Sequence, residues 1–209
     1  MSLINPLKNE LGKAASTKNS SERAIRIAVI IAEALRSIQQ DPILVGGAAV
    51  EFYTQGAYST SDIDMVTEGG QDLIQIMESL GFEKIGKDFV NKKFKIYIEF
   101  PSKNLKPNET SSLLEINNQK LQIISVEDLI VDRLCAFQFW QSEIDGLNVL
   151  LLFENNEVNK NRLSQRAQEE KVVDALKGLL KIREEIIRKK IPQKIANQML
   201  KELMESLKQ

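Results

Sequence analysis

Hydrophobic and polar positions follow two different periods along the chain. Up to about residue 124, short runs that alternate between apolar and polar residues are separated by segments in which apolar residues recur every three or four positions. Alternation is typical of half-buried strands, whereas a spacing of three to four is typical of helices. From Ser125 onward the helical spacing continues almost to the end of the chain. The pattern therefore predicts an α+β protein, with an α/β domain over residues 20–124 and a helical domain over residues 125–209.

Local stop signals divide these two parts into elements. Asp41-Pro42 and Gly81 each end a run of helical spacing, because proline and glycine interrupt helices. Further breaks are expected near Asn155-Asn156 and Ile191-Pro192. Residues 1–20 are polar, and we expect them to be loose. The predicted helices cover residues 21–40, 48–56 and 71–81, and the predicted strands cover residues 43–45, 61–67, 82–86, 88–93, 94–101 and part of 113–124.

Two aspartates interrupt the apolar strand predicted around residue 63. In a strand, residues two apart point to the same face, so Asp62 and Asp64 share one face. Ile63 and Met65 then point to the other face, toward a core. Like charges this close disfavour each other unless a cation lies between them, and a divalent metal with oxygen ligands is the natural partner. The alternative is a pair of solvent-facing aspartates on an edge strand.

A third carboxylate lies in the strand predicted over residues 94–101. The apolar residues of this run point to one face, which leaves Glu99 on the other. If this strand lies beside the strand of Asp62, Glu99 joins the two aspartates. The alternatives are an ion pair with one of the many nearby lysines, or simple exposure. Lys95 precedes Glu99 by four residues, so the alternation places it on the same face.

A pair of glycines opens the helix that follows the strand at 43–45. Gly46 and Gly47 let the backbone approach a ligand closely, and a helix N-terminus offers free N–H groups to a phosphate. Ser59 and Thr60, just before the aspartates, add hydroxyl groups that would contact phosphate or cap a turn. Glycines and hydroxyl side chains are common in turns, so turn formation is the alternative for all four residues.

The composition removes several kinds of chemistry. The chain has 209 residues, no histidine and one cysteine, which excludes histidine-based triads, the common zinc sites and an intrachain disulfide. Cys135 lies at helical spacing among apolar residues, where we expect a small buried side chain rather than a catalytic thiol. Catalysis would therefore depend on carboxylates, hydroxyl groups, lysine and arginine, with or without a hard metal ion.

Charge is balanced overall but uneven along the chain. The net charge of −1 argues against a polybasic nucleic-acid binder. Lysines are concentrated in residues 84–106, and lysines and arginines in residues 177–194. Either segment would attract a phosphate-rich ligand. For the second segment a solvated helix face is the preferred interpretation, whereas the first flanks the candidate carboxylates.

The distribution of apolar residues bears on where the protein is located and on what it binds. No apolar run reaches the roughly 18 residues of a membrane-spanning helix, so we expect no membrane association. The N-terminal segment lacks the apolar core of a secretory signal, so we expect a cytoplasmic protein. Phe137, Phe139 and Trp140 are expected in the core or in an interface, with stacking on a nucleic-acid base as the alternative.

The glycine turn and the three carboxylates, in this order, resemble the nucleotidyltransferase superfamily with a polymerase beta-like fold. Its members have a Gly-Gly or Gly-Ser turn, an Asp-x-Asp strand and a third carboxylate on a neighbouring strand. The matching segments here are LVGGAAVEFYTQGAYSTSDIDMV, IYIEFPS and ISVEDLIVDRLCAF. Over about residues 40–140 the chain looks most similar to minimal bacterial nucleotidyltransferases related to abortive-infection and toxin–antitoxin systems. The resemblance implies a mixed β-sheet with flanking helices, followed by a helical half.

The resemblance also implies a reaction. It is the Mg²⁺- or Mn²⁺-dependent transfer of a nucleoside monophosphate from an NTP to a hydroxyl group of a protein, a tRNA or a small molecule. Asp62, Asp64 and Glu99 would be the catalytic and metal-binding residues, and Glu99 would alternatively accept the proton of the attacking hydroxyl. Backbone N–H groups of Gly46 and Gly47 would bind phosphate. The further candidates for phosphate contacts are Ser59, Thr60 and Lys95.

One departure from the superfamily pattern keeps two other functions open. Many relatives carry Lys-Asp-x-x-Asp on a later helix, and in the corresponding stretch, residues 140–145, Asp145 matches but the lysine is absent. A degenerate transferase domain would then act as an antitoxin-like or scaffolding module that binds a protein through its helical half. An antibiotic-modifying nucleotidyltransferase is the other alternative, because residues 143–157 contain four acidic residues and no lysine or arginine, as suits a cationic aminoglycoside.

Overall fold

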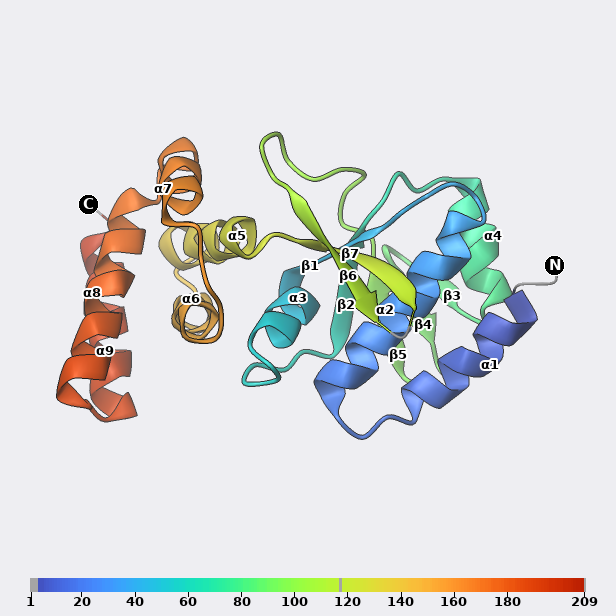
Figure 1. Ribbon diagram of the computed structural model, residues 1–209, viewed down its shortest axis with the longest axis horizontal. Coiled ribbons are helices and arrows are strands. Elements are labelled where there is room, and N and C mark those ends of the chain that lie inside the picture. The colour runs from blue at the N-terminus through green and yellow to red at the C-terminus, as the bar shows by residue number, and fades with distance from the viewer. Residues whose placement is uncertain (1–3, 117, 209) are drawn as a thin grey trace. The chain divides into compact units, whose positions relative to one another are not determined.

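The computed structural model describes residues 4–116 and 118–208. The chain divides into two compact units, Met1–Ser125 and Val126–Gln209. The first unit combines a sheet with helices, and the described part of the second unit is helical (Figure 1).

In the described part of the first unit, seven strands form one sheet. They are β1 (Ile43–Val45), β2 (Asp62–Val66), β3 (Glu83–Ile85), β4 (Asp88–Asn91), β5 (Ile96–Glu99), β6 (Ser111–Ile116) and β7 (Gln119–Ile124). Their order across the sheet is β3-β4-β5-β2-β1-β7-β6. β1 pairs antiparallel with β2 and parallel with β7, while β2 pairs parallel with β5. The α+β class and the mixed sheet predicted from the sequence are confirmed.

Helices cover the apolar side of this sheet. Those described in the first unit are α1 (Ile4–Ala15), α2 (Ser20–Arg36), α3 (Gly46–Tyr53) and α4 (Gln71–Ser79). α2 crosses in front of the sheet in Figure 1 and contacts β7, α3 and α4. Its residues Ile27, Ile31 and Leu35, each four apart, are completely buried. This stripe on one side of the helix is what the helical spacing in the sequence predicted.

One face of the sheet carries the core. The register pairs Leu44 with Met65 and Ile63 with Ile98, and all four side chains are buried. Since successive residues of a strand point to opposite faces, the residues between them point away from this core. The other face of β2 and β5 is therefore the one that carries polar side chains.

The expectation that residues 1–20 are loose is wrong for the described part of that segment. Ile4–Ala15 form α1, which packs against α2 and buries Leu7, Leu11 and Ala14. These residues are four and three positions apart, so they lie on one side of the helix. Because this stripe is narrow and the residues around it are polar, the average polarity of the segment did not indicate a packed helix.

The described helices of the second unit are separated by more breaks than the sequence predicted. They are α5 (Val126–Phe139), α6 (Glu143–Asn155), α7 (Lys160–Glu169), α8 (Val173–Lys189) and α9 (Gln193–Ser206). The breaks after Asn155 and before Gln193 were predicted. Those at Gln141 and Lys171 were not, because no glycine or proline marks them, although both residues have a positive φ, of 55° and 60°. None of the helices described in either unit is long and apolar enough to cross a membrane.

The aromatic residues at the end of α5 divide between core and surface. Phe137 is completely buried, but Phe139 is 57% exposed and Trp140 is 82% exposed. Of the two expected places, the core is therefore wrong for Phe139 and Trp140, and an interface stays a prediction for them. Residues two apart on a helix lie about 200° apart around its axis, and Trp140 follows the end of the helix. Cys135, expected to be buried, is half-buried.

A buried ion cluster joins α5 to α7. Asp128 is 1% exposed, accepts a hydrogen bond of 2.8 Å from Nε of Arg166, and forms an ion pair with Arg162. Burial opposes the charge of Arg166, but hydrogen bonds with Asp128 and Glu169 outweigh it and raise its pKa. Removing one partner from such a cluster weakens the compensation of the buried charges that remain, so these residues are expected to matter for the stability of the helical unit.

Candidate active site

Asp62 and Asp64 lie on the polar face of β2, as the alternation predicted. Ile63 and Met65 are buried in the core, while Asp62 is exposed and Asp64 is half-buried. The hydroxyl of Ser61 donates a hydrogen bond of 3.0 Å to Oδ1 of Asp62. The two aspartates are therefore held on one face of a strand whose other face is fixed by the core.

The neighbouring strand β5 places Glu99 beside the two aspartates. β2 and β5 pair in parallel, with Asp64 opposite Glu99 and Asp62 opposite Tyr97. Adjacent strands lie about 4.8 Å apart, so residues opposite each other are neighbours on the same face. The sequence predicted this grouping on the condition that the two strands are adjacent, and the structure meets that condition.

The glycine turn lies directly against these carboxylates. β1 runs along the other side of β2 with Val45 opposite Asp64, and α3 begins at the next residue. Gly46 has a φ of +62°, and a Cβ at this position would lie 2.2 Å from Oδ2 of Asp64. A Cβ at Gly47 would lie 3.1 Å from Oγ1 of Thr60. Both glycines thus allow a close approach that brings the first backbone N–H groups of α3 to the aspartate strand.

Thr60 links the glycine turn to the aspartate strand. Its side chain lies against Gly47, its backbone N–H donates a hydrogen bond of 3.1 Å to Oε2 of Glu51, and its hydroxyl accepts one of 3.4 Å from the N–H of Asp62. Thr60 therefore organises a turn, the alternative role named from the sequence. Ser59 is exposed in the same loop. Phosphate contacts by Ser59 and Thr60 stay predictions.

A small pocket of about 150 Å³ lies beside the carboxylates, and it is lined by Asp62, Asp88, Tyr97, Ile98 and Glu99. Asp88 comes from β4, which pairs antiparallel with β5 and places Asp88 opposite Glu99. Asp88 was not predicted from the sequence, because its position depends on the register of two strands. Pockets that enclose whole small molecules are about 300–1,000 Å³, so this volume suits ions and phosphate oxygens rather than a complete nucleotide.

Lys87 forms an ion pair with the third carboxylate. Its Nζ lies 2.8 Å from Oε1 of Glu99, and its side chain is 73% exposed. The hydrogen bond and the negative charge of Glu99 raise the pKa of Lys87 above its ordinary value. Pairing of Glu99 with a nearby lysine was an alternative from the sequence, although Lys87 itself was not identified. Its exposure leaves Lys87 free to move to another anion.

Lys95 does not share the face of Glu99, so that prediction is wrong. β5 begins at Ile96, and Lys95 lies in the preceding turn with a φ of +52°. The alternation that related the two residues therefore does not extend to Lys95, which is also absent from the lining of the carboxylate pocket. A phosphate contact by Lys95 stays a prediction, from the end of β5 opposite to Glu99.

The donor atoms at this face suit a hard divalent cation. In residues 4–116 and 118–208, no three acidic or cysteine side chains are placed closely enough to hold a metal ion. Mg²⁺, however, typically takes only one or two protein carboxylates and fills its shell with water and phosphate oxygens. The Asp62–Asp64 pair, with the glycine turn directly beside Asp64, meets that smaller requirement.

The acidic stretch over residues 143–157 is partly neutralised. Asp145 is buried and pairs with Arg133 at 2.9 Å, and Glu143 pairs with Lys201 at 3.5 Å. Asp145, the residue that matches the helix motif of the superfamily, therefore has an ion-pairing role inside the helical unit. Two of the four acidic residues that would suit a cationic aminoglycoside are therefore paired with basic residues of the helical unit.

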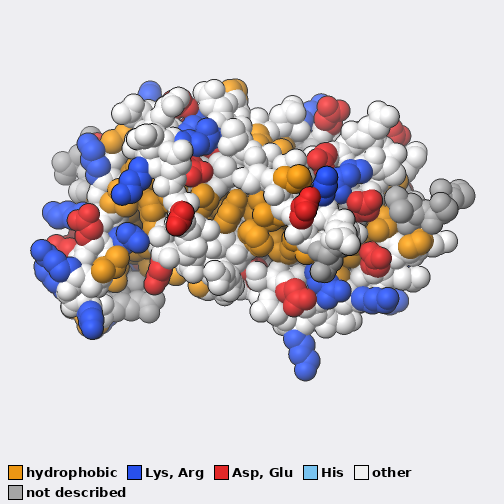
Figure 2. Space-filling model, in the orientation of Figure 1, with side chains coloured by type: hydrophobic (Ala, Val, Ile, Leu, Met, Phe, Trp, Pro, Cys, Tyr) orange, Lys and Arg blue, Asp and Glu red, His pale blue; other side chains and the backbone are white. Residues whose placement is uncertain are grey.

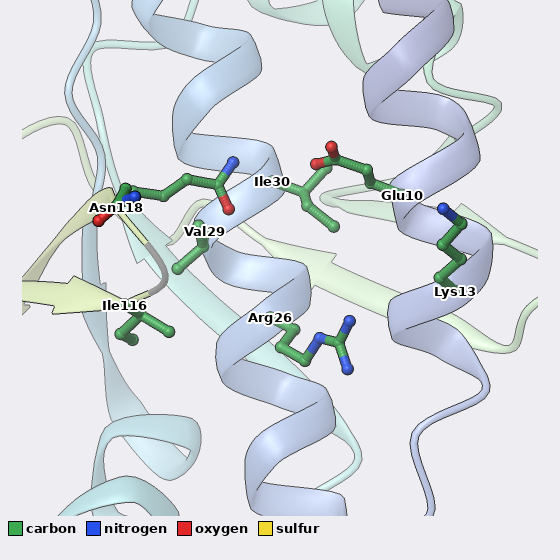
Figure 3. A pocket seen from close by; sticks show the side chains of 8 residues that line it. Glu10, Lys13, Arg26, Val29, Ile30, Ile116 and Asn118 are labelled. Atoms are coloured by element: carbon green, nitrogen blue, oxygen red, sulfur yellow. The ribbon is translucent and has the colours of Figure 1, made fainter.

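A separate pocket of about 510 Å³ lies beside α1 and α2 in the first unit (Figure 3). Glu10, Lys13 and Arg26 surround a floor that includes the buried residues Val29 and Ile30. None of the residues predicted for the active site is among those that line it. The polar face of β2 and β5 therefore remains the candidate site.

Positive and negative side chains are interspersed over the surface shown in Figure 2. This distribution accords with the net charge of −1. Long-range attraction of a ligand requires a field of one sign, which an interspersed surface does not supply. On this face, recognition of a ligand would therefore depend on local groups rather than on a long-range field.

Comparison with known proteins identifies the family. Residues 25–186 match the model of a family described as nucleotidyltransferase of unknown function (DUF6036). The chain belongs to this family. The matched range includes every residue that the sequence predicted for the active site of this DUF6036 protein.

A solved structure supports the same fold. The crystal structure of an antigenic nucleotidyltransferase-like protein from Paracoccidioides brasiliensis is similar to this chain, with a TM-score of 0.61 and 19% sequence identity. The similarity covers 86% of this chain and 94% of that chain. No curated protein matches the sequence. The DUF6036 chain is thus a member of the nucleotidyltransferase superfamily in both sequence and fold.

Proposed function

We propose that this DUF6036 protein transfers a nucleoside monophosphate from an NTP to a hydroxyl acceptor and requires Mg²⁺ or Mn²⁺. The contact between Gly46 and the carboxylate of Asp64 supports this proposal most directly. It places a helix N-terminus, which favours phosphate, beside the carboxylates, which favour a divalent cation. A triphosphate bound with its metal ion needs both kinds of group at one place.

Asp62 and Asp64 would hold the metal ion, and Glu99 would hold a second ion or act as a base. The bound ion supplies positive charge that neutralises the triphosphate. Backbone N–H groups of Gly46 and Gly47 would donate hydrogen bonds to phosphate oxygens. Thr60 is fixed beside this turn, and its hydroxyl is a further candidate to donate a hydrogen bond to a phosphate oxygen. These groups would orient the α-phosphorus toward the acceptor, and positioning together with electrostatic stabilisation accounts for most of the catalysis in phosphoryl transfer.

Glu99 is the candidate to accept the proton of the acceptor hydroxyl. In the transfer step a bond forms between the acceptor oxygen and the α-phosphorus, and the bond from that phosphorus to the bridging oxygen of the β-phosphate breaks. Pyrophosphate leaves, and the hydroxyl proton moves to the carboxylate. Glu99 must first release Lys87, which would then be free to pair with a phosphate.

The acceptor class follows from the resemblance rather than from the site. A protein hydroxyl, the 3′ end of a tRNA and a small molecule are the candidates, and toxin–antitoxin or phage-defence systems are the candidate setting. A cytoplasmic location belongs to the same proposal. The helical unit, with the exposed side chains of Phe139 and Trp140, is the candidate surface for a protein partner.

The test is incubation with each labelled NTP, Mg²⁺, tRNA and cell extract, followed by identification of the labelled product. We expect label transfer by the wild-type protein and none by Asp62→Asn, which removes a carboxylate from an exposed position and leaves the core of β2 intact. Circular dichroism would establish that the variant is folded. Equal transfer by Asp62→Asn and the wild type would show that the site is assigned wrongly.

A second candidate, a binding module without catalytic activity, is favoured by two observations. The third carboxylate is occupied by Lys87, and no metal-binding group of three acidic residues is found among the described residues. A protein of this kind would bind a partner through its helical unit. Absence of label transfer to any acceptor, together with capture of a specific partner, would favour this candidate.

A further inference from the structure

Glu51 is a buried acidic residue in the first helix of the candidate site. It lies on α3 and has no exposed surface. Burial of a carboxylate is unfavourable unless charges or hydrogen bonds compensate it. Asp128, the comparable buried acid of the helical unit, has two arginine partners. Glu51 has none within the described part of the chain.

The hydrogen bonds of Glu51 lead to the loop before β2. Its Oε2 accepts the backbone N–H of Thr60 at 3.1 Å, and Oε1 has no hydrogen-bond partner among the described residues. Buried polar atoms are usually satisfied, so the single hydrogen bond that the described residues offer this buried carboxylate makes its contact with Thr60 the feature to explain. The fold keeps an acidic side chain here at a cost, for a single contact with the loop.

Thr60, which makes this contact, touches two parts of the site at once. The side chain of Thr60 lies against Gly47, where it meets the backbone at the start of α3. Its hydroxyl accepts the N–H of Asp62 at 3.4 Å. The position of Thr60 therefore sets the distance between the glycine turn and the first aspartate of β2.

We propose that Glu51 is a positioning residue, which fixes Thr60 so that the glycine turn and Asp62 address the same triphosphate. The role of the triphosphate rests on the proposed function. The attachment of the loop before β2 to Glu51, through the hydrogen bond from the N–H of Thr60, does not. Glu51 acts through the Thr60 amide and does not touch the nucleotide. A side chain of similar size that still accepts a hydrogen bond from the Thr60 N–H should therefore keep Thr60 in place. A side chain without an acceptor should not.

Two variants separate positioning from a general contribution to folding. Glu51→Gln keeps an acceptor oxygen at the same length. Glu51→Met fills a similar volume without an acceptor and removes the cost of burying a carboxylate, so we expect it to fold. Asn91→Ala is the matched control. Asn91 is also buried, and its Oδ1 accepts the N–H of Phe94 at 3.1 Å, but it does not line the carboxylate pocket.

The first measurement is hydrogen exchange of the amides in residues 57–62, which does not depend on activity. We expect the Thr60 amide to lose protection in Glu51→Met and to keep it in Glu51→Gln and Asn91→Ala. Thermal unfolding of the same samples should show that Glu51→Met is as stable as the wild type. Equal protection of Thr60 in Glu51→Met and the wild type would refute the attachment.

The second measurement is the rate of label transfer. A displacement of about 1 Å at an active site can reduce the rate by roughly 100-fold, so we expect a loss of that size in kcat/KM for Glu51→Met. Glu51→Gln should remain close to the wild type. If Glu51→Gln protects Thr60 but loses transfer, the carboxylate acts directly and the positioning role is wrong. If the wild type itself transfers no label, the proposed function fails, and the attachment of the loop is decided by hydrogen exchange alone.

Discussion

Replacement of Gly46 by alanine tests the close contact between the glycine turn and the aspartate strand. The new Cβ would lie 2.2 Å from Oδ2 and 2.9 Å from Cγ of Asp64, far inside the distance of ordinary contact. Gly46 also has a φ of +62°, a conformation that L-residues rarely adopt. The variant therefore carries two separate penalties, one from the backbone and one from the collision.

The size of the effect follows from these two terms. A left-handed conformation costs about 1–2 kcal/mol for a residue with a Cβ. Overpacking of a filled site costs about 1–3 kcal/mol. We therefore expect Gly46→Ala to lower the free energy of unfolding by about 2–5 kcal/mol, or the melting temperature by roughly 4–20 °C for a chain of this size.

The assay is urea unfolding followed by circular dichroism, with hydrogen exchange of β2 to assign the transition to the first unit. Gly86→Ala is the control, because Gly86 has a φ of +63° but no atom within 4 Å of its Cβ position. It should show the backbone penalty alone, about 1–2 kcal/mol. In the background of Asp64→Ala the cost of Gly46→Ala should fall by about 0.5–3 kcal/mol, the usual coupling of residues in contact.

Two results would refute this reasoning. If Gly46→Ala and Gly86→Ala destabilise the protein equally, the collision with Asp64 does not exist in solution. If the cost of Gly46→Ala is the same with and without the Asp64 side chain, the two residues are not in contact. Either result would separate the glycine turn from the carboxylates and remove the basis of the candidate site.

Two further predictions concern charged residues. Lys87→Ala should raise the affinity for Mn²⁺ in a titration, because it removes an ammonium group that competes for Glu99. Lys92→Ala, which breaks a comparable exposed pair, is the control and should leave the affinity unchanged. Unchanged affinity in both variants would show that the Lys87 pair has no influence on the site. Asp128→Ala should lower the free energy of unfolding of residues 126–209 by about 1–3 kcal/mol in urea, because it removes the buried partner of Arg166 and Arg162 while Arg166 keeps its pairs with Glu169 and Glu170. The absence of a measurable loss would contradict the buried cluster.

Alternation in the sequence was sufficient to predict the faces of single strands. Asp62 and Asp64 fall on the polar face of β2 and Glu99 on the polar face of β5, because each strand has one buried side that fixes the other. The glycine pair was recognised because the backbone needs freedom where a strand turns into a helix. The sequence could not reveal why each position needs a glycine. A side chain at Gly46 would collide with the neighbouring strand β2, and one at Gly47 would crowd the loop before it.

Residues that join the site through register were not predictable in the same way. Asp88 reaches Glu99 because β4 pairs with β5 in one particular register, and Lys87 reaches it from the turn beside that strand. Lys95 was misplaced because the alternation was extended one residue beyond the start of β5. Glu51 resembles an exposed helix residue in the sequence, and only its burial reveals a contact with the loop.

Calorimetric titration of Mg²⁺ together with each NTP tests the central claim most directly, because it measures binding without assuming an acceptor. We expect one NTP or more to bind the wild-type protein only when Mg²⁺ is present, and binding to be lost in folded Asp64→Asn. Binding of Mg²⁺ with NTP that is unchanged in Asp64→Asn, or the absence of binding with every NTP, would contradict a metal–nucleotide site at the glycine turn. The second of these results would instead favour the binding module.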